Sequence, residues 1–377
     1  MEKETGVLAA IACNLDVDIL SAAFPLLEAG RVEALEWSFD TLYGAKQVPD
    51  WFYELLRTYS SQNRLVGHGV FFSLLSGKWT PEQQHWLQHL RQLATDFSFD
   101  HITEHFGFFT GQNFHYGAPL TIPFTSTTLR IGQDRLRRIS DACQCPVGLE
   151  NLAFSYSLEE VKRHGEFLQK LIEPVNGFII LDLHNLYCQL HNFSVSYEDL
   201  IRLYPLDRVR EIHISGGSWE ASELVPDQRI RRDTHDDAVP EEVFDLLKQT
   251  LPKCPYLKYV VLEQLGNGLK TEDSRSRFRN DFSRMKLLVE ESNNSFPKHP
   301  EKFFLPRQPM LLGPAEEDEA LYQQQLLLSH ILETAPSYAE AKLQLTTSSL
   351  ADSAWHLESW EPHMLETAWQ IAQKWKK

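Results

Sequence analysis

Residues 176–192, NGFIILDLHNLYCQLHN, change character at a single position. The run 178–181 is continuously apolar, which is typical of a parallel strand buried on both faces. Asp182, His184 and Asn185 follow at once, and such groups are costly to bury unless partners compensate them. The segment therefore predicts a core strand that ends at a functional position.

Seven further segments have the same short, β-rich character, and longer amphipathic helical patterns separate several of them. They are 7–13, 32–38, 65–72, 99–107, 147–153, 209–215 and 259–265. Eight strand-helix units within about 285 residues match the size of a TIM barrel. The sequence thus predicts an α/β fold of the (β/α)8 barrel type. An open doubly wound sheet is the alternative, but no G-x-G-x-x-G follows the first strand.

The amino-acid composition of the chain changes near residue 292. Five prolines fall between Pro297 and Pro314, which is typical of an extended connector. We therefore expect a barrel over 1–291, a proline-rich linker over 292–314 and a helical C-terminal extension over 315–377. In the extension, an apolar stripe at helical spacing predicts either packing on the barrel or a docking surface. It consists of Leu365, Ala368, Trp369, Ala372 and Trp375.

Composition excludes several classes of protein. The formal charge of −16 argues against binding nucleic acid or an anionic membrane through a basic face. The N-terminal sequence lacks the pattern of a secretory signal, and no apolar run reaches the ~18 residues of a membrane span. Five scattered cysteines without a C-x-x-C pair indicate a reducing compartment. We expect a cytoplasmic protein.

Six of the eight predicted strands end in, or carry, polar side chains that can bind metal. In TIM barrels the catalytic groups come from such carboxyl ends. Nitrogen and oxygen donors without cysteine favour zinc, manganese or iron, and their number exceeds the needs of one ion, so two or three ions are expected. A salt-bridged mouth without metal is the alternative, but basic residues are scarce here. The residues are His68, His101, Glu104, His105, Glu150, Asn151, Asp182, His184, Asn185, His213 and Glu263, with Asp233 and His235 beyond the seventh strand.

Six motifs in order make these residues recognisable: ITEHFGF (102–108), GLENLAFSY (148–156), LDLHNLY (181–187), EIHISGG (211–217), DTHDDAVPEEVFDLL (233–247) and VVLEQ (260–264). In this order and spacing the chain resembles the multinuclear non-heme iron-dependent oxidative enzymes. That family includes the methanobactin biosynthesis enzyme that installs oxazolone and thioamide groups. The resemblance covers roughly residues 60–285.

The resemblance implies an oxidase or oxygenase with two or three irons, Fe(II) or Fe(III), at the mouth of a TIM barrel. Such an enzyme uses O2 to modify a ribosomally made precursor peptide, at cysteine or aspartate, in natural-product biosynthesis. A companion peptide-recognition protein is a further partner that it implies. Carried over by motif, one iron is assigned to His68, His105 and Glu150, a second to Asp182 or Asn185 with His213 and Glu263, and a third to Asp233 and His235.

The chain departs from the family pattern in three places. His184 stands where the family usually has asparagine, and strand alternation would turn it to the same face as Asp182, so it is an open candidate for an extra ligand. HISGGSW replaces a continuation that usually supplies a second histidine near His213. The extension has no counterpart in the family core.

Ligand histidines need an acceptor for the other ring nitrogen, and Asp100, Glu104 and Glu211 are candidates by sequence proximity. Two other functions stay open at this point. One is a divalent-metal barrel of the sugar isomerase or endonuclease type, acting as an isomerase or hydrolase. The other is a non-catalytic scaffold that binds a peptide through its extension.

Overall fold

The computed structural model describes residues 6–43, 45, 47–109, 119–295, 304–306 and 312–376. Eight parallel strands close into a barrel in the order β1-β12-β9-β8-β7-β4-β3-β2, which confirms the predicted fold class. Pairing of the first strand with the last, from Leu8↔Tyr259 to Ile11↔Leu262, completes the closure. The strands are β1 Leu8–Ala12, β2 Ala34–Trp37, β3 Leu65–Gly69, β4 Phe99–His105, β7 Val147–Glu150, β8 Phe178–Asp182, β9 Val209–Ile214 and β12 Tyr259–Leu262.

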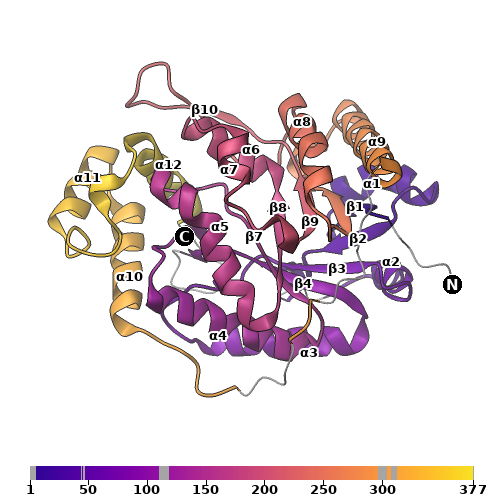
Figure 1. The fold of residues 1–377 in the computed structure, drawn as a ribbon, viewed down its shortest axis with the longest axis horizontal. Helices are drawn as coiled ribbons and strands as arrows, with labels where there is room; N and C mark the ends of the chain where they lie inside the picture. Colours follow the sequence, from indigo (N-terminus) through magenta and orange to yellow (C-terminus); the bar gives the residue numbers. More distant parts are fainter. Residues whose placement is uncertain are drawn as a thin grey trace.

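Helices connect the strands and cover the outside of the barrel (Figure 1). The main ones are α1 Val17–Glu28, α2 Asp50–Ser60, α3 Pro81–Asp96, α4 Ser126–Cys143, α5 Leu158–Ile172, α6 Leu183–Asn192, α8 Glu241–Thr250 and α9 Glu272–Ser295. A short helix, α7 Tyr197–Ile201, follows α6. Two small hairpins lie outside the barrel sheet: β5 Phe108–Phe109 with β6 Pro119–Leu120, and β10 Trp219–Ala221 with β11 Arg229–Arg231.

The helices begin where the sequence supplies capping side chains. Thr80 and Gln83 form a capping box at the start of α3, with Pro81 at the first helical position. Ser157 caps α5 by accepting a hydrogen bond from the Glu160 N–H group. Asp182 has two roles, because it is the last residue of β8 and also the cap of α6. The turn from strand to helix is therefore immediate at the position where the sequence changes character.

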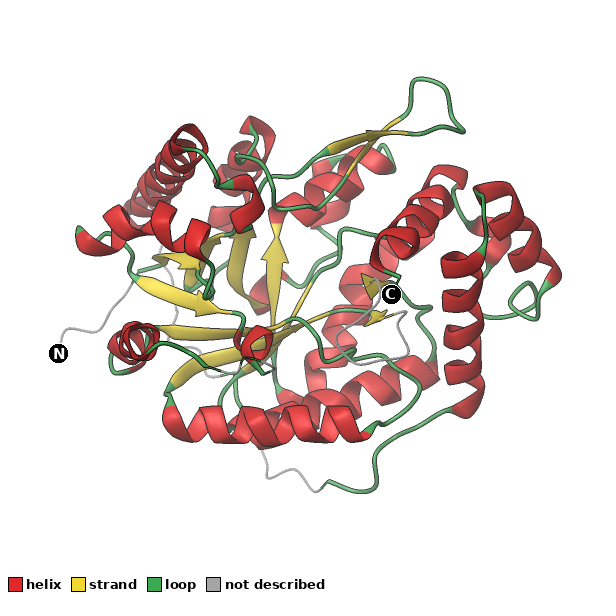
Figure 2. Ribbon diagram, turned by 180° about the vertical axis from the view of Figure 1, so that it is seen from behind, coloured by secondary structure: helices red, strands yellow, loops and turns green. Residues whose placement is uncertain are grey.

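The C-terminal extension packs on one side of the barrel, next to α4 and α5 (Figures 1 and 2). It contains α10 Glu319–Thr334, α11 Tyr338–Thr347, a single 3-10 turn η6 Leu357–Ser359 and α12 Pro362–Trp375. The rings of Tyr156 and Trp360 stack with centroids 3.6 Å apart. A Cβ atom on Gly77 would lie 2.7 Å from the backbone nitrogen of Tyr322, so a glycine permits the close approach of α10.

The apolar stripe of the extension is mainly a packing surface. Leu365, Ala368 and Ala372 are buried, and the Trp369 indole donates a hydrogen bond to the Ala335 carbonyl at 3.0 Å. Trp375 differs, since half of it is exposed. Most of the predicted linker lies outside the described residues, and α9 extends past residue 291 to Ser295. None of the helices within the described ranges is long and apolar enough to cross a bilayer.

Candidate metal centre at the barrel mouth

Three neighbouring strands bring His68, His105 and Glu150 together. His68 lies in β3, and His105 and Glu150 are the last residues of β4 and β7. Glu150 Oε2 lies 2.9 Å from His105 Nε2 and 3.3 Å from His68 Nε2, and the two histidine nitrogens are 3.1 Å apart. Burial raises the pKa of Glu150, but the two histidines outweigh it and hold that pKa well below its usual value. The cluster offers two nitrogen donors and one carboxylate to a single ion.

The orientation of His68 is fixed from behind by Thr103. His68 Nδ1 is 2.8 Å from the Thr103 hydroxyl, which itself donates to the Gly67 carbonyl at 3.3 Å. Because that hydroxyl proton is already used, the Nδ1–H group of His68 donates to Thr103. The lone pair of His68 Nε2 then points at the cluster, as a metal ligand requires.

A second group shares Glu150 with the first. Ligand atoms of Glu150, Asp182, His213 and Glu263 all lie within 4.8 Å of one another. His213 Nδ1 is 3.3 Å from Glu263 Oε2 and 3.8 Å from Glu150 Oε1. The sheet register pairs Asp182 with His213 directly. Since Glu150 faces both groups through different oxygens, it is placed to bridge two ions.

Asn185 orients these carboxylates. Its side-chain NH2 group donates to Glu150 Oε1 at 3.2 Å and to the Asn151 carbonyl at 2.8 Å, and its backbone N–H group donates to Asp182 Oδ1. Both sequence alternatives for the second ion lie here: Asp182 supplies an oxygen to the group, and Asn185 Oδ1 is buried beside it without a hydrogen-bond partner among the described residues.

Asp233 and His235 come from the loop between β11 and α8. His235 Nε2 lies 2.8 Å from Asp233 Oδ1, and His235 Nδ1 lies 3.7 Å from Glu263 Oε2. The loop therefore reaches the edge of the second group. His235 has a φ of 51°, a left-handed conformation that costs a non-glycine residue about 1–3 kcal/mol and is frequent at functional sites.

The argument from strand alternation for His184 is wrong, because β8 ends at Asp182 and His184 belongs to the first turn of α6. His184 Nε2 accepts from Arg231 Nε at 3.0 Å, and its Nδ1–H group donates to Asp233 Oδ1 at 2.9 Å. Both ring nitrogens thus have protein partners, and the side chain holds Asp233. A Cβ atom on Gly217 would lie 2.8 Å from the His184 ring, so the glycines that replace the family histidine leave room for this contact.

Sequence reasoning missed Glu36, which lies in β2 and is fully buried. Its Oε2 atom is 3.1 Å from His213 Nε2, and Glu211 Oε1 is 3.4 Å from the same nitrogen. Burial raises the pKa of Glu36 to about 7, although His213 and His68 oppose the shift. The available signal was two glutamates, Glu33 and Glu36, within the short predicted strand VEALEWS. Of the candidate acceptors, Glu211 lies 3.4 Å from His213 Nε2 without a hydrogen bond to it, whereas the Thr103 hydroxyl performs the acceptor role for His68.

The donor set fits cations. Within the described residues, Asp182 Oδ2, Asn185 Oδ1 and His213 Nδ1 are buried and make no hydrogen bond. Burial, then the neighbouring Asp233 and Glu150, raises the pKa of Asp182 well above its usual value. Crowded carboxylates of this kind are relieved by a bound cation, and imidazole with carboxylate suits iron, zinc or manganese.

Residues 45–270 match the sequence model of the RiPP precursor modification enzyme family MbnB/TglH/ChrH. The chain belongs to this family. The family is described as one of enzymes that modify precursors of ribosomally synthesised and post-translationally modified peptides.

Individual relatives are more distant. A UPF0276 protein of Shewanella loihica is 25% identical over 191 residues, which cover 51% of this chain and 66% of the relative. One from Nitrosospira multiformis is 29% identical over 187 residues, covering 49% and 62%. The chain thus matches less than two thirds of the length of these two relatives. Among solved structures, an L-ribulose 3-epimerase superimposes with a TM-score of 0.50 at 11% identity, covering 76% of this chain and 96% of the epimerase. That likeness shows the barrel fold.

Proposed function

We propose that this family member is a multinuclear non-heme iron enzyme that uses O2 to modify a ribosomally made precursor peptide oxidatively. The observation that carries the proposal is the pair of ligand groups that share Glu150 at the barrel mouth. One shared carboxylate between two nitrogen-containing groups suits two adjacent ions. The family supports the peptide as substrate class.

In this proposal His68, His105 and Glu150 hold the first iron, and Glu150, Asp182, His213 and Glu263 hold the second. Asp233 and His235 serve a third position at the loop edge. The NH2 group of Asn185 orients Glu150, and its Oδ1 atom is free to bind the second iron beside Asp182. His184 is a positioning residue for Asp233 rather than a ligand.

Iron at these positions would supply open coordination sites for dioxygen and for a cysteine or aspartate side chain of the peptide. The chain's own residues prepare that chemistry. Thr103 holds the outer ring nitrogen of His68 by a hydrogen bond, and the carboxylates of Glu36 and Glu211 lie 3.1 and 3.4 Å from Nε2 of His213. His105 and His235 are partly exposed at the rim, with 34% and 21% of their side chains accessible, so a peptide can approach from their side.

The test is iron stoichiometry and Mössbauer spectroscopy on anaerobically purified protein, followed by coexpression with short peptides encoded beside the gene. We expect at least two irons per chain and an O2-dependent mass change of one peptide. His105→Ala and Glu263→Ala should abolish the mass change while circular dichroism stays unaltered. Undiminished product formation without O2 would overturn the oxidative proposal.

The same measurements separate the alternatives. Zinc or manganese in place of iron would favour an isomerase or hydrolase of the sugar isomerase or endonuclease type. If the protein is a non-catalytic scaffold, His105→Ala and Glu263→Ala should leave peptide binding intact, whereas deletion of residues 315–377 should abolish it.

A further inference from the structure

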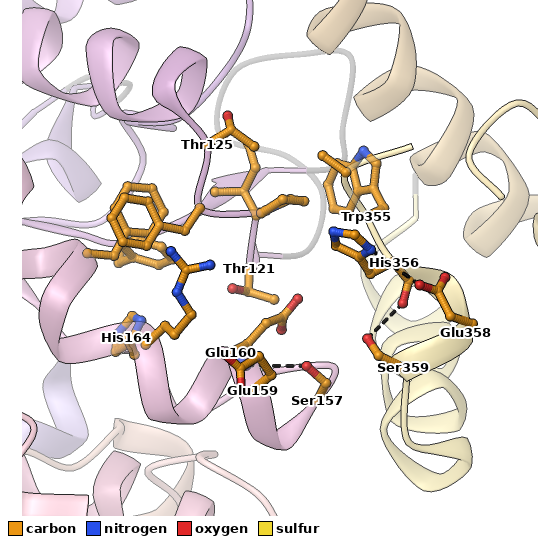
Figure 3. A pocket seen from close by; sticks show the side chains of 17 residues that line it. Thr121, Thr125, Ser157, Glu159, Glu160, His164, Trp355, His356, Glu358 and Ser359 are labelled. Atoms are coloured by element: carbon orange, nitrogen blue, oxygen red, sulfur yellow. Dashed lines mark hydrogen bonds and ion pairs between the residues drawn. The ribbon is translucent and has the colours of Figure 1, made fainter. Parts of the chain in front are cut away.

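A cavity of about 330 Å3 lies between the barrel and the C-terminal extension, away from the ligand groups described above. Its size is within the ~300–1,000 Å3 range of ligand pockets. One wall consists of the segment 121–125 and the exposed end of α5, and the other consists of residues 354–359 of the extension. Figure 3 shows Thr121, Glu160 and His164 on the barrel side, across the pocket from His356 and Glu358.

Aromatic rings form the apolar part of this pocket. Phe124 and Phe167 are stacked with centroids 4.3 Å apart, and Phe106 meets Phe167 edge-on at 5.1 Å. Trp355, which is 1% exposed, lines the opposite wall. Rigid rings around a cavity favour an aromatic or long aliphatic side chain of a ligand.

Carboxylates dominate the polar part of the pocket. Glu159, Glu160 and Glu358 line it, against the single guanidinium of Arg163. That guanidinium lies over the Phe124 ring at 4.6 Å and 3.9 Å from Glu166, so neighbours outside the acidic trio already engage its charge. Burial raises the pKa of Glu160 to about 7, and a cation nearby would favour its ionised form.

The histidines of the pocket do not reverse this charge. His164 Nε2 accepts a hydrogen bond from the Leu152 N–H group at 3.1 Å, and burial lowers its pKa to about 3, so the ring is neutral at physiological pH. His356 is exposed, and its Nδ1–H group donates to the Glu358 carboxylate at 3.2 Å. Carboxylates next to aromatic faces are the chemistry that recognises an organic cation.

The pocket is also close to the metal centre along the chain. Phe106 in its wall is the residue directly after His105, and Ser157 follows the Glu150 strand end by one short loop. Since neighbouring Cα atoms are about 3.8 Å apart, this wall of the pocket begins one residue from a candidate ligand.

We infer that this pocket binds a segment of the precursor peptide that carries a lysine or arginine beside an aromatic or aliphatic residue, and so holds the substrate next to the metal centre. The inference rests on the proposed function for the identity of the peptide. It gives the extension a part in substrate binding within the same chain.

Binding of defined probes to the anaerobic, iron-loaded full chain tests this. The probes are fluorescein-labelled octapeptides, Gly-Ser-Leu-Lys-Phe-Lys-Ser-Gly and the same peptide with both lysines replaced by glutamate, with fluorescence anisotropy as the readout. We expect the lysine peptide to bind at least tenfold more tightly. The double variant Glu159→Gln with Glu358→Gln, both at exposed positions, should weaken it about tenfold.

The matched control is Glu290→Gln with Glu291→Gln, which removes the same charge from exposed positions on α9. It should leave the affinity unchanged, and iron content should be equal in all three proteins. Equal affinity for the two peptides, no binding of the lysine peptide, or no effect of the pocket variant would overturn the inference. So would lysinamide that competes as tightly as the octapeptide, since that would assign the pocket to a small organic cation. None of these readouts needs O2 or turnover, so they are independent of whether the oxidative chemistry is correct.

Discussion

The two sides of the barrel mouth differ in what carries their side chains. His68, His105, Glu150 and His213 come from strands; His105 is 34% exposed, and the other three side chains are at most 4% exposed. Asp233 and His235 come from a loop, with 24% and 21% of their side chains exposed, and His235 has a left-handed backbone. The strand side is fixed by the ladder of the sheet, whereas the loop side depends on a few contacts such as that of His184. Ligands on rigid elements are held more precisely than ligands on loops.

The largest effect should follow from changing the residue that both strand groups share. Glu150→Gln removes one carboxylate from each group. We therefore expect the iron affinity at both positions to fall by more than about 100-fold, which exceeds the loss expected when only a hydrogen-bond partner of a ligand is changed. Iron analysis after gel filtration measures this, with Glu290→Gln as the control. Retention of one tightly bound iron would show that the two groups are independent and that Glu150 is no bridge.

Asp233→Asn should lower the iron content less than Glu150→Gln does, because it changes only the loop side. We expect loss of one iron where three are bound, with the Mössbauer signals of the other two retained. The loss should appear first as faster removal by a chelator, since a loop holds its ligands less rigidly than the strands do. Loss of all iron together would contradict the distinction between a rigid and a loop-borne side.

Thr103→Val and Glu36→Gln form a reciprocal pair on the strand side. Thr103→Val removes the hydrogen-bond acceptor of the His68 ring, and Glu36→Gln removes a carboxylate charge 3.1 Å from His213 Nε2. Each should weaken the binding of one iron about tenfold. Thr103→Val should affect the first group and Glu36→Gln the second, so that each variant is the control of the other. If both variants weaken the same iron, or neither weakens any, the orientation roles are wrong.

The same contrast explains what the sequence could predict. Periodicity and strand ends identified the barrel and the strand-borne residues, because a side chain at the end of a parallel strand has one direction in which to point. Glu36 escaped notice, since nothing in VEALEWS shows that its carboxylate faces His213 across the barrel. His184 was misread because the position at which a strand becomes a helix decides the face of every later residue. The strand ends at Asp182, two residues before His184.

His184→Asn, which restores the residue usual in the family, should have the smallest effect. His184 donates to Asp233 Oδ1 at 2.9 Å, and a shorter side chain loses that contact while both strand groups keep theirs. One hydrogen bond is worth about 0.5–1.5 kcal/mol, so we expect roughly a threefold loss of affinity at the loop position only. Iron titration with a competing chelator measures it, and Asp233→Asn sets the upper limit. Because Arg231 occupies the other ring nitrogen, loss of a strand-borne iron in this variant would mean that His184 turns away from Arg231 and binds metal itself.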